Sequence, residues 1–130
     1  MRQIRNYKYS ILVALAIIVL STIPVPEVKP LEDVPLIDKW VHFLMYALLS
    51  VAMWWDSRSR HQPISAGYYI LMLILPSLLG GLMELVQAYL TTCRSGDWLD
   101  AVADAIGAII GTVLCFVISM IWKEKTSIQK

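Results

Sequence analysis

Long apolar stretches separated by short polar connections dominate the sequence. Uncharged stretches run from Tyr9 to Pro26, from Trp40 to Trp55, from Ala66 to Leu90 with Glu84 as the one interruption, and from Ala105 to Trp122. Each approaches the roughly 20 residues that a helix needs to cross about 30 Å of hydrocarbon. None has the period-two alternation of a barrel strand. With their polar flanks, these stretches predict an all-α fold, a bundle of four transmembrane helices at about 9–26, 38–55, 66–90 and 98–122, in a single domain over residues 1–130.

The composition agrees with a membrane protein. Hydrophobic residues make up 58% of the chain and the mean hydropathy is +0.63, outside the range of ordinary soluble domains. The formal charge of +1 gives no reason to expect a nucleic-acid partner. Cys93 lies in a polar connection and Cys115 within an apolar run, so we expect two free thiols. The sequence has no zinc-type cysteine spacing and no phosphate-binding glycine loop, and we predict no cofactor.

The distribution of positive charge predicts how the helices are oriented. Eight of the eleven lysines and arginines lie in three segments: the N-terminal segment, the connection after the second predicted helix, and the C-terminal tail. Cytoplasmic segments are enriched in these residues, so both termini are predicted to be cytoplasmic. A basic start followed by an apolar run is also typical of a signal peptide. This run is long and lacks an A-x-A site, which favours a retained helix.

Polar residues recur at helical spacing near one end of the last three predicted helices. Asp38, His42 and Tyr46 share a stripe of the second helix, Glu84 and Gln87 lie on the third, and the fourth has the set Asp97, Asp100 and Asp104. An isolated ionisable group within a membrane span is costly, so we expect these groups to face one another. They predict an outward-facing pocket, whose lining residues would be Asp38, Lys39, His42, Tyr46, Glu84, Gln87, Arg94, Asp97, Asp100 and Asp104.

The depth of the carboxyl groups suggests which side chains meet. Glu84 lies about 10 Å before the end of its helix near Thr91, and Asp104 lies about 10 Å after Asp97. His42, Glu84 and Asp104 are therefore the candidate acid and base groups. Together with Asp100 they offer one imidazole nitrogen and several oxygens. No single helix has a recognisable ligand spacing, so the sequence predicts no metal site.

Several of these residues also have plain structural interpretations. Asp38 and Lys39 could be a helix N-cap and a lysine whose ammonium extends to the membrane surface. Arg94 could pair with an aspartate to close the last two helices together. Gly107 and Gly111 form a G-x-x-x-G step, which favours helix packing within the bundle, with self-dimerisation as the alternative.

Three blocks of the sequence together resemble the signature of the VanZ-like family. They are DKWVHFLMY (38–46), GLMELVQ (81–87) and RSGDWLDAVADAIGAIIG (94–111). The resemblance implies a small multi-pass protein of the bacterial cytoplasmic membrane, linked in some members to teicoplanin susceptibility. One position departs from the pattern: Asp104 stands where the family usually has asparagine. It adds either a negative charge or a protonated carboxyl group.

These observations support three hypotheses of function. The first is a protein that binds or modulates a cell-envelope lipid headgroup or precursor, with Arg94 pairing an anionic group. The second is a membrane enzyme that acts on a lipid-linked envelope substrate, with Glu84 or Asp104 as acid or base and His42 as its partner. In the third, the buried polar residues only fix the packing of the helices. The substrate and the oligomeric state do not follow from the sequence.

Overall fold

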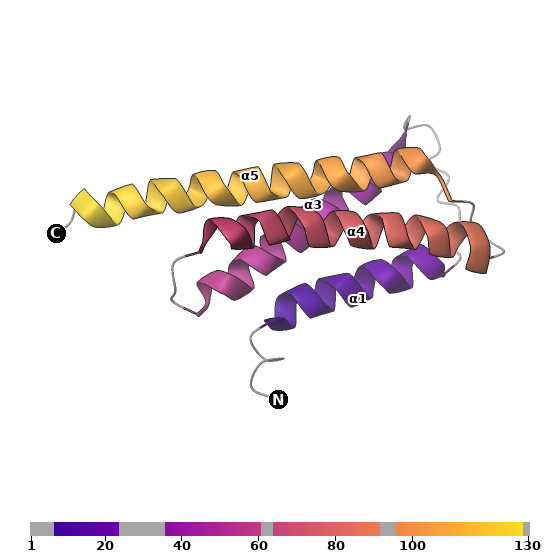
Figure 1. The fold of residues 1–130 in the computed structure, drawn as a ribbon, viewed down its shortest axis with the longest axis horizontal. Coiled ribbons are helices and arrows are strands. Elements are labelled where there is room, and N and C mark those ends of the chain that lie inside the picture. Colours follow the sequence, from indigo (N-terminus) through magenta and orange to yellow (C-terminus); the bar gives the residue numbers. More distant parts are fainter. Residues whose placement is uncertain (1–6, 24–35, 61–63, 92–95, 129–130) are drawn as a thin grey trace.

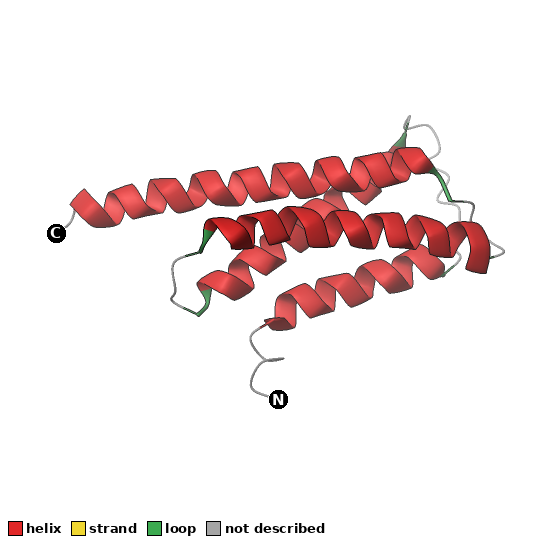
Figure 2. Cartoon of the chain, in the orientation of Figure 1, coloured by secondary structure: helices red, strands yellow, loops and turns green. Residues whose placement is uncertain are grey.

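The computed structural model describes residues 7–23, 36–60, 64–91 and 96–128, and these residues form four α-helices and no β-strand (Figures 1 and 2). The helices are α1 (Lys8–Thr22), α3 (Ile37–Arg58), α4 (Ala66–Leu90) and α5 (Trp98–Ile128). In Figure 1, α1 and α4 run in one direction, and α3 and α5 run in the other. The all-helical prediction is therefore confirmed for the described residues.

The helix boundaries follow local chemistry, and three of them differ from the predicted bounds: α1 ends earlier than predicted, α3 covers 37–58 in place of 38–55, and α5 continues beyond 122 to Ile128. The helix predicted over 9–26 ends at Thr22, because Ile23 is already extended, with φ −83° and ψ 147°. Ile23 precedes Pro24, and the residue before a proline is disfavoured in helical conformation. At the start of α4, the Ser65 hydroxyl accepts a hydrogen bond from Tyr68 N, as an N-cap residue does. The helix α4 has the bounds that the sequence predicts.

The helices α3 and α5 pack closely because glycines of α5 face the backbone of α3. A Cβ atom added to Gly107 would overlap the carbonyl oxygen of Phe43, and one added to Gly111 would lie 2.7 Å from the carbonyl oxygen of Ala47. Most of the contacts of α3 are with α5. The two glycines thus remove the side chains that would hold the helix backbones apart.

A buried serine lies where three helices meet. The Ser50 hydroxyl on α3 is within 3.2 Å of the Met72 carbonyl oxygen on α4 and 3.4 Å of the Ala108 carbonyl oxygen on α5. All three residues are fully buried. Helix backbones approach this closely only where the intervening side chains are small, so this contact marks the centre of the bundle.

The described part of the chain contains two helices that are long and apolar enough to cross a membrane. These are α4, with 25 residues, and the 26-residue stretch Trp98–Lys123 of α5. Only 28% of the most apolar window of each is buried inside the molecule, whereas a core helix of a soluble protein would be mostly buried. The helix α1 is apolar but has 15 residues. The helix α3 has 22 residues and carries charged side chains near both of its ends.

A buried carboxylate holds α1 against α3 at the end of the bundle where α1 begins. Asp56 is 2% exposed. Its oxygens accept hydrogen bonds from Ser10 N (2.8 Å), Ser10 Oγ (2.6 Å) and Tyr9 N (3.3 Å). The first N–H groups of a helix have no partner within the helix, so Asp56 caps α1 from a neighbouring helix.

Of the two cysteines, Cys115 is a buried free thiol, whereas Cys93 lies outside the described residues.

Candidate functional site

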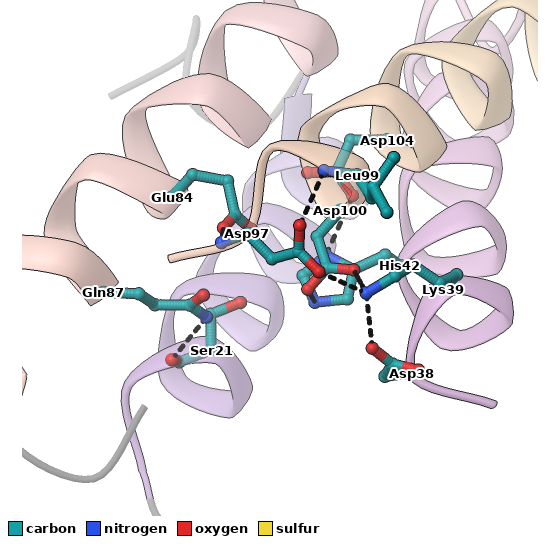
Figure 3. Close-up of polar contacts among 10 residues, drawn as sticks. All are labelled: Ser21, Asp38, Lys39, His42, Glu84, Gln87, Asp97, Leu99, Asp100 and Asp104. Carbon is teal, nitrogen blue, oxygen red and sulfur yellow. Dashed lines mark hydrogen bonds and ion pairs between the residues drawn. The ribbon is translucent and has the colours of Figure 1, made fainter. Parts of the chain in front are cut away.

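Ionisable side chains from three helices collect at the end of the bundle where α3 and α5 begin and α1 and α4 end (Figure 3). We call this the polar end. Its described ionisable members carry five carboxyl groups against one lysine and one histidine: Asp38, Lys39, His42, Glu84, Asp97, Asp100 and Asp104. The polar end is therefore acidic in its described part.

The lysine group of the polar end consists of Lys39 and the three aspartates around it. Lys39 Nζ lies 2.6 Å from Asp38 Oδ2, 2.7 Å from Asp97 Oδ2 and 2.6 Å from Asp100 Oδ1 (Figure 3). The Lys39 ammonium beside Asp97 holds the pKa of that carboxyl below its ordinary value, and a hydrogen bond from Leu99 N acts in the same direction. This group joins the start of α3 to the start of α5.

The contacts of the lysine group change two of the structural interpretations. Asp38 is not an N-cap, because α3 begins at Ile37 and Leu36 occupies the cap position with a left-handed backbone. The Lys39 ammonium does not extend away from the protein, since its side chain is only 17% exposed between the aspartates. Lys39 joins α3 to α5 through its ion pairs with Asp97 and Asp100. The sequence suggested a similar ion pair for Arg94, between the last two helices. Arg94 itself lies outside the described residues.

The histidine group lies deeper and consists of His42, Glu84 and Asp104, one from each of α3, α4 and α5. All three are buried, with 3%, 4% and 0% of their surface exposed. His42 Nδ1 lies 3.0 Å from Asp104 Oδ1, and His42 Nε2 lies 3.7 Å from Asp100 Oδ2. One nitrogen of His42 and one oxygen each of Glu84 and Asp104 lie within 4.8 Å of one another. The structure thus brings together the three candidate acid and base groups.

The start of α5 is attached to the histidine group through Glu84. Asp97 N donates a 2.6 Å hydrogen bond to Glu84 Oε2. Asp97 also caps α5, because its Oδ1 accepts from Leu99 N at 2.9 Å and its carbonyl oxygen accepts from Asp100 N at 2.9 Å. A carboxylate on α4 and the first turn of α5 therefore hold each other in place.

Two buried carboxylate oxygens of the histidine group have no hydrogen-bond donor among the described residues. They are Glu84 Oε1 and Asp104 Oδ2. The hydroxyl of Tyr46, one helical turn after His42 on α3, is also buried without a partner there. Leaving a buried acceptor unsatisfied costs about 1–3 kcal/mol, and more when the acceptor is charged. A donor or a cation that reached these oxygens would recover that free energy.

A small pocket opens beside Glu84. It has a volume of about 90 Å³ and is lined by Glu84, Leu85, Ala88, Tyr89, Gly96, Asp97 and Trp98. Gly96 allows the chain to approach α4, because an added Cβ would lie 2.5 Å from the Glu84 carbonyl oxygen and 2.9 Å from Ala88 Cβ. The rings of Tyr89 and Trp98 are largely exposed at its rim. Of the residues predicted to line a pocket, Glu84 and Asp97 line this one.

The sequence predicts that Gln87 lines the pocket, and in the structure its side-chain amide contacts α1. Its Nε2 donates a 3.0 Å hydrogen bond to the carbonyl oxygen of Ser21 on α1, and it is 2% exposed (Figure 3). The side chain therefore ties α4 to α1. The position of Gln87 three residues after Glu84 predicts that the two side chains lie on the same face of the helix. That spacing could not identify the carbonyl oxygen of Ser21 as the partner of Gln87.

Sequence reasoning missed the role of Gly80. A Cβ added there would lie 2.5 Å from Asp104 Oδ2 and 2.7 Å from Asp104 Cβ. Gly80 therefore makes the space on α4 that Asp104 fills. The sequence contains a signal for this contact. Gly80 precedes Glu84 by one helical turn and therefore lies on the same face of α4 as Glu84. The glycine pair Gly80-Gly81 does not reveal which member faces the carboxylate.

Two groups of acidic residues at the polar end have the ligand chemistry of cation sites. The first is the histidine group, and the second is the set Asp38, Asp97 and Asp100. The second already surrounds an ammonium, that of Lys39. The first offers nitrogen and oxygen ligands from three different helices, which is why no spacing along one helix could predict it.

The comparisons with known proteins identify one family. A family model described as VanZ/LLP1 matches residues 2–119, which include α1, α3, α4 and most of α5. Comparison with curated proteins and with solved structures gives no match.

Proposed function

The chain belongs to the VanZ/LLP1 family, and from that membership and the acidic polar end we propose that it binds the headgroup of a membrane lipid or lipid-linked envelope precursor. The observation that carries this proposal is the pocket beside Glu84, next to buried carboxylate oxygens that have no donor among the described residues. Such oxygens favour a ligand that brings hydrogen-bond donors or positive charge. Ammonium and hydroxyl groups of lipid headgroups have this chemistry.

The proposal includes a topology. Residues 1–130 form one domain with four spans in the bacterial cytoplasmic membrane, both termini are cytoplasmic, and the polar end faces outward. The excess of lysine and arginine in the segments at the opposite end supports this orientation. The exposed apolar side chains of α4 and α5, on the outside of the bundle, support contact with lipid. An outward site would meet headgroups of the outer leaflet and precursors exported to it.

The rim of the pocket suits a ligand that is anchored in the membrane. Tyr89 and Trp98 are 81% and 74% exposed, and such aromatic side chains favour the boundary between hydrocarbon and headgroups. A lipid could place its acyl chains beside α4 and α5 while its headgroup reached Glu84. Arg94 is proposed to pair with the phosphate of the headgroup.

Binding a headgroup or precursor at this site would modulate the envelope. In this proposal a link to teicoplanin susceptibility arises because the bound precursor or lipid becomes less available at the outer surface. The link is a proposal for this chain and rests on the family membership alone.

The test compares two carboxylates buried at opposite ends of the bundle. Protein is extracted with its surrounding lipids and analysed by native mass spectrometry, for the unmodified chain and for Glu84→Gln and Asp56→Asn. Each substitution replaces a buried carboxylate with an amide of the same size. Binding at the polar end predicts that Glu84→Gln loses co-purified lipid and that Asp56→Asn retains it. Equal lipid retention in all three proteins, with unchanged teicoplanin susceptibility of producing cells, would rule out the proposal.

A membrane enzyme is the second candidate. It is favoured by the proximity of one imidazole and two buried carboxyl groups, which is the equipment of general acid–base catalysis. His42, Glu84 and Asp104 would carry the chemistry on a lipid-linked substrate. Turnover of such a substrate by purified protein, lost in His42→Gln, would favour the enzyme. Tight headgroup binding without turnover would favour the binding protein.

A further inference from the structure

We propose that the histidine group is a binding site for one divalent transition-metal ion, with Zn²⁺ as the best match. One nitrogen of His42 and one oxygen each of Glu84 and Asp104 lie within 4.8 Å of one another, on three different helices. One imidazole and two carboxylates form a ligand set that suits Zn²⁺. This proposal replaces the expectation of no metal that followed from the sequence, and it does not depend on headgroup binding.

The buried oxygens without donors are the independent observation that points to a cation. Glu84 is 4% exposed and Asp104 is not exposed, yet Glu84 Oε1 and Asp104 Oδ2 have no donor among the described residues. Groups that serve only to pack helices are normally satisfied when they are buried. Two buried carboxylates with oxygens within 4.8 Å of each other also repel unless positive charge or a proton lies between them.

His42 and Asp104, which share a hydrogen bond here, lie at a separation that two ligands of one metal ion can also have. His42 Nδ1 and Asp104 Oδ1 are 3.0 Å apart, close to the roughly 3.3 Å that separates two ligands of a tetrahedral Zn²⁺ at about 2.0 Å. Glu84 has rotatable bonds through which its carboxylate can approach. Three protein ligands leave one position open, as in sites that bind water or a substrate.

The surroundings of the three ligands also resemble a metal site. His42 Nε2 lies 3.7 Å from Asp100 Oδ2, and ligating histidines commonly turn their second nitrogen toward a carboxylate. Asp97 N fixes Glu84 Oε2 by a 2.6 Å hydrogen bond. Ligating carboxylates are likewise held by hydrogen bonds. The neighbouring lysine group is a poorer site, because the Lys39 ammonium already occupies it.

A bound ion would reduce the excess of negative charge at the polar end. The described residues there hold five carboxyl groups against one lysine and one histidine. An anionic phosphate would be repelled by this arrangement unless a cation intervened. A divalent ion beside the pocket would attract the phosphate of a headgroup. This role of the ion in phosphate binding rests on the proposed headgroup binding.

The experiment measures metal binding in protein purified in detergent, stripped with a chelator and then titrated with Zn²⁺, with Mn²⁺ as a second probe. We expect one Zn²⁺ per chain by elemental analysis. Glu84→Gln and Asp104→Asn should weaken binding by roughly tenfold or more, and the control Asp56→Asn, at the opposite end, should not. Absence of bound ion in the unmodified chain, or equal affinity in all four proteins, would overturn the site.

A spectroscopic measurement on the unmodified chain keeps the test independent of how the variants fold. Co²⁺ loaded in place of Zn²⁺ should give the visible absorption of a four-coordinate nitrogen and oxygen site. The spectrum of an octahedral, fully hydrated ion would contradict the proposal. Because these measurements use no added lipid, and the lipid analysis can be repeated with chelator present, failure of the metal site and failure of headgroup binding are distinguishable.

Discussion

The adjacent glycines Gly80 and Gly81 provide a matched test of how α4 and α5 meet. A Cβ added to Gly80 would lie 2.5 Å from Asp104 Oδ2, 2.7 Å from Asp104 Cβ and 3.0 Å from Asp104 Cγ. A Cβ added to Gly81 would meet nothing within 4 Å. Both residues lie in the interior of α4. We therefore predict that Gly80→Ala destabilises the fold and that Gly81→Ala does not.

The magnitude follows from two opposing effects. Replacing a helix-interior glycine with alanine stabilises by about 0.5–1 kcal/mol, and both variants gain this contribution. The difference between them is then the cost of overpacking alone, about 1–3 kcal/mol. Asp104 cannot move aside easily, because it is fully buried and its Oδ1 contacts His42 Nδ1. We expect Gly81→Ala to be slightly more stable than the unmodified chain and Gly80→Ala to be less stable.

The assay is reversible unfolding in mixed micelles by a denaturing detergent, followed by tryptophan fluorescence. The free energies of the two variants are compared at the same micelle composition. Equal stability of Gly80→Ala and Gly81→Ala would refute the contact between Gly80 and Asp104. If the contact is correct, Gly80→Ala should also lower the affinity for Zn²⁺, since it displaces one of the proposed ligands.

Three further predictions concern the rest of the bundle. Asp56→Asn should destabilise by about 1 kcal/mol, measured by the same unfolding assay, because α1 loses a charged cap. Gly107→Ala should destabilise through overlap with α3, whereas Gly67→Ala, with its nearest neighbour 3.9 Å away, should not; comparing their unfolding free energies checks this. The pKa of Asp97 is lowered in the folded state by Lys39, so its ion pair stabilises above pH about 4 and is lost as the pH falls through the folded-state pKa. The stability advantage of the unmodified chain over Asp97→Asn should therefore be constant from neutral pH to about pH 5 and shrink below about pH 4.

The sequence predicts those features that depend on periodicity along one helix. The bounds of α4 follow from an apolar run after Ser65 that only Glu84 interrupts, and the stripe that contains His42 follows from the four-residue spacing. Equal depth along two antiparallel helices was enough to suggest that Glu84 and Asp104 meet. These features need only the rise per residue and the cost of isolated charges in an apolar surrounding.

Contacts that depend on how each helix is rotated could not be predicted. The Asp56 carboxylate could cap α1 only if the end of α3 lay beside the start of α1, and nothing in the spacing of either helix states this. The bond from Asp97 N to Glu84 requires the path of the connection between α4 and α5. The central position of Lys39 among three aspartates depends on the same path, because two of the three belong to the start of α5.

The remaining question about the histidine group is whether its oxygens are satisfied from outside the chain, and the stability of Glu84→Gln distinguishes the answers. The amide oxygen can keep the bond from Asp97 N, while the amide nitrogen takes the place of the unpartnered Oε1 and can donate to Asp104. If the carboxylates form a ligand-binding site that is empty in the free protein, replacing one of them with an amide relieves their repulsion. With both proteins treated with chelator, Glu84→Gln should then be more stable than the unmodified chain by about 1 kcal/mol. If the group only fixes helix packing, its present form is the optimum, and the variant should be less stable with no change in lipid or metal content. A stabilised variant that has lost its ligand is the result that we expect, because a site that is unsatisfied in the free protein trades stability for binding.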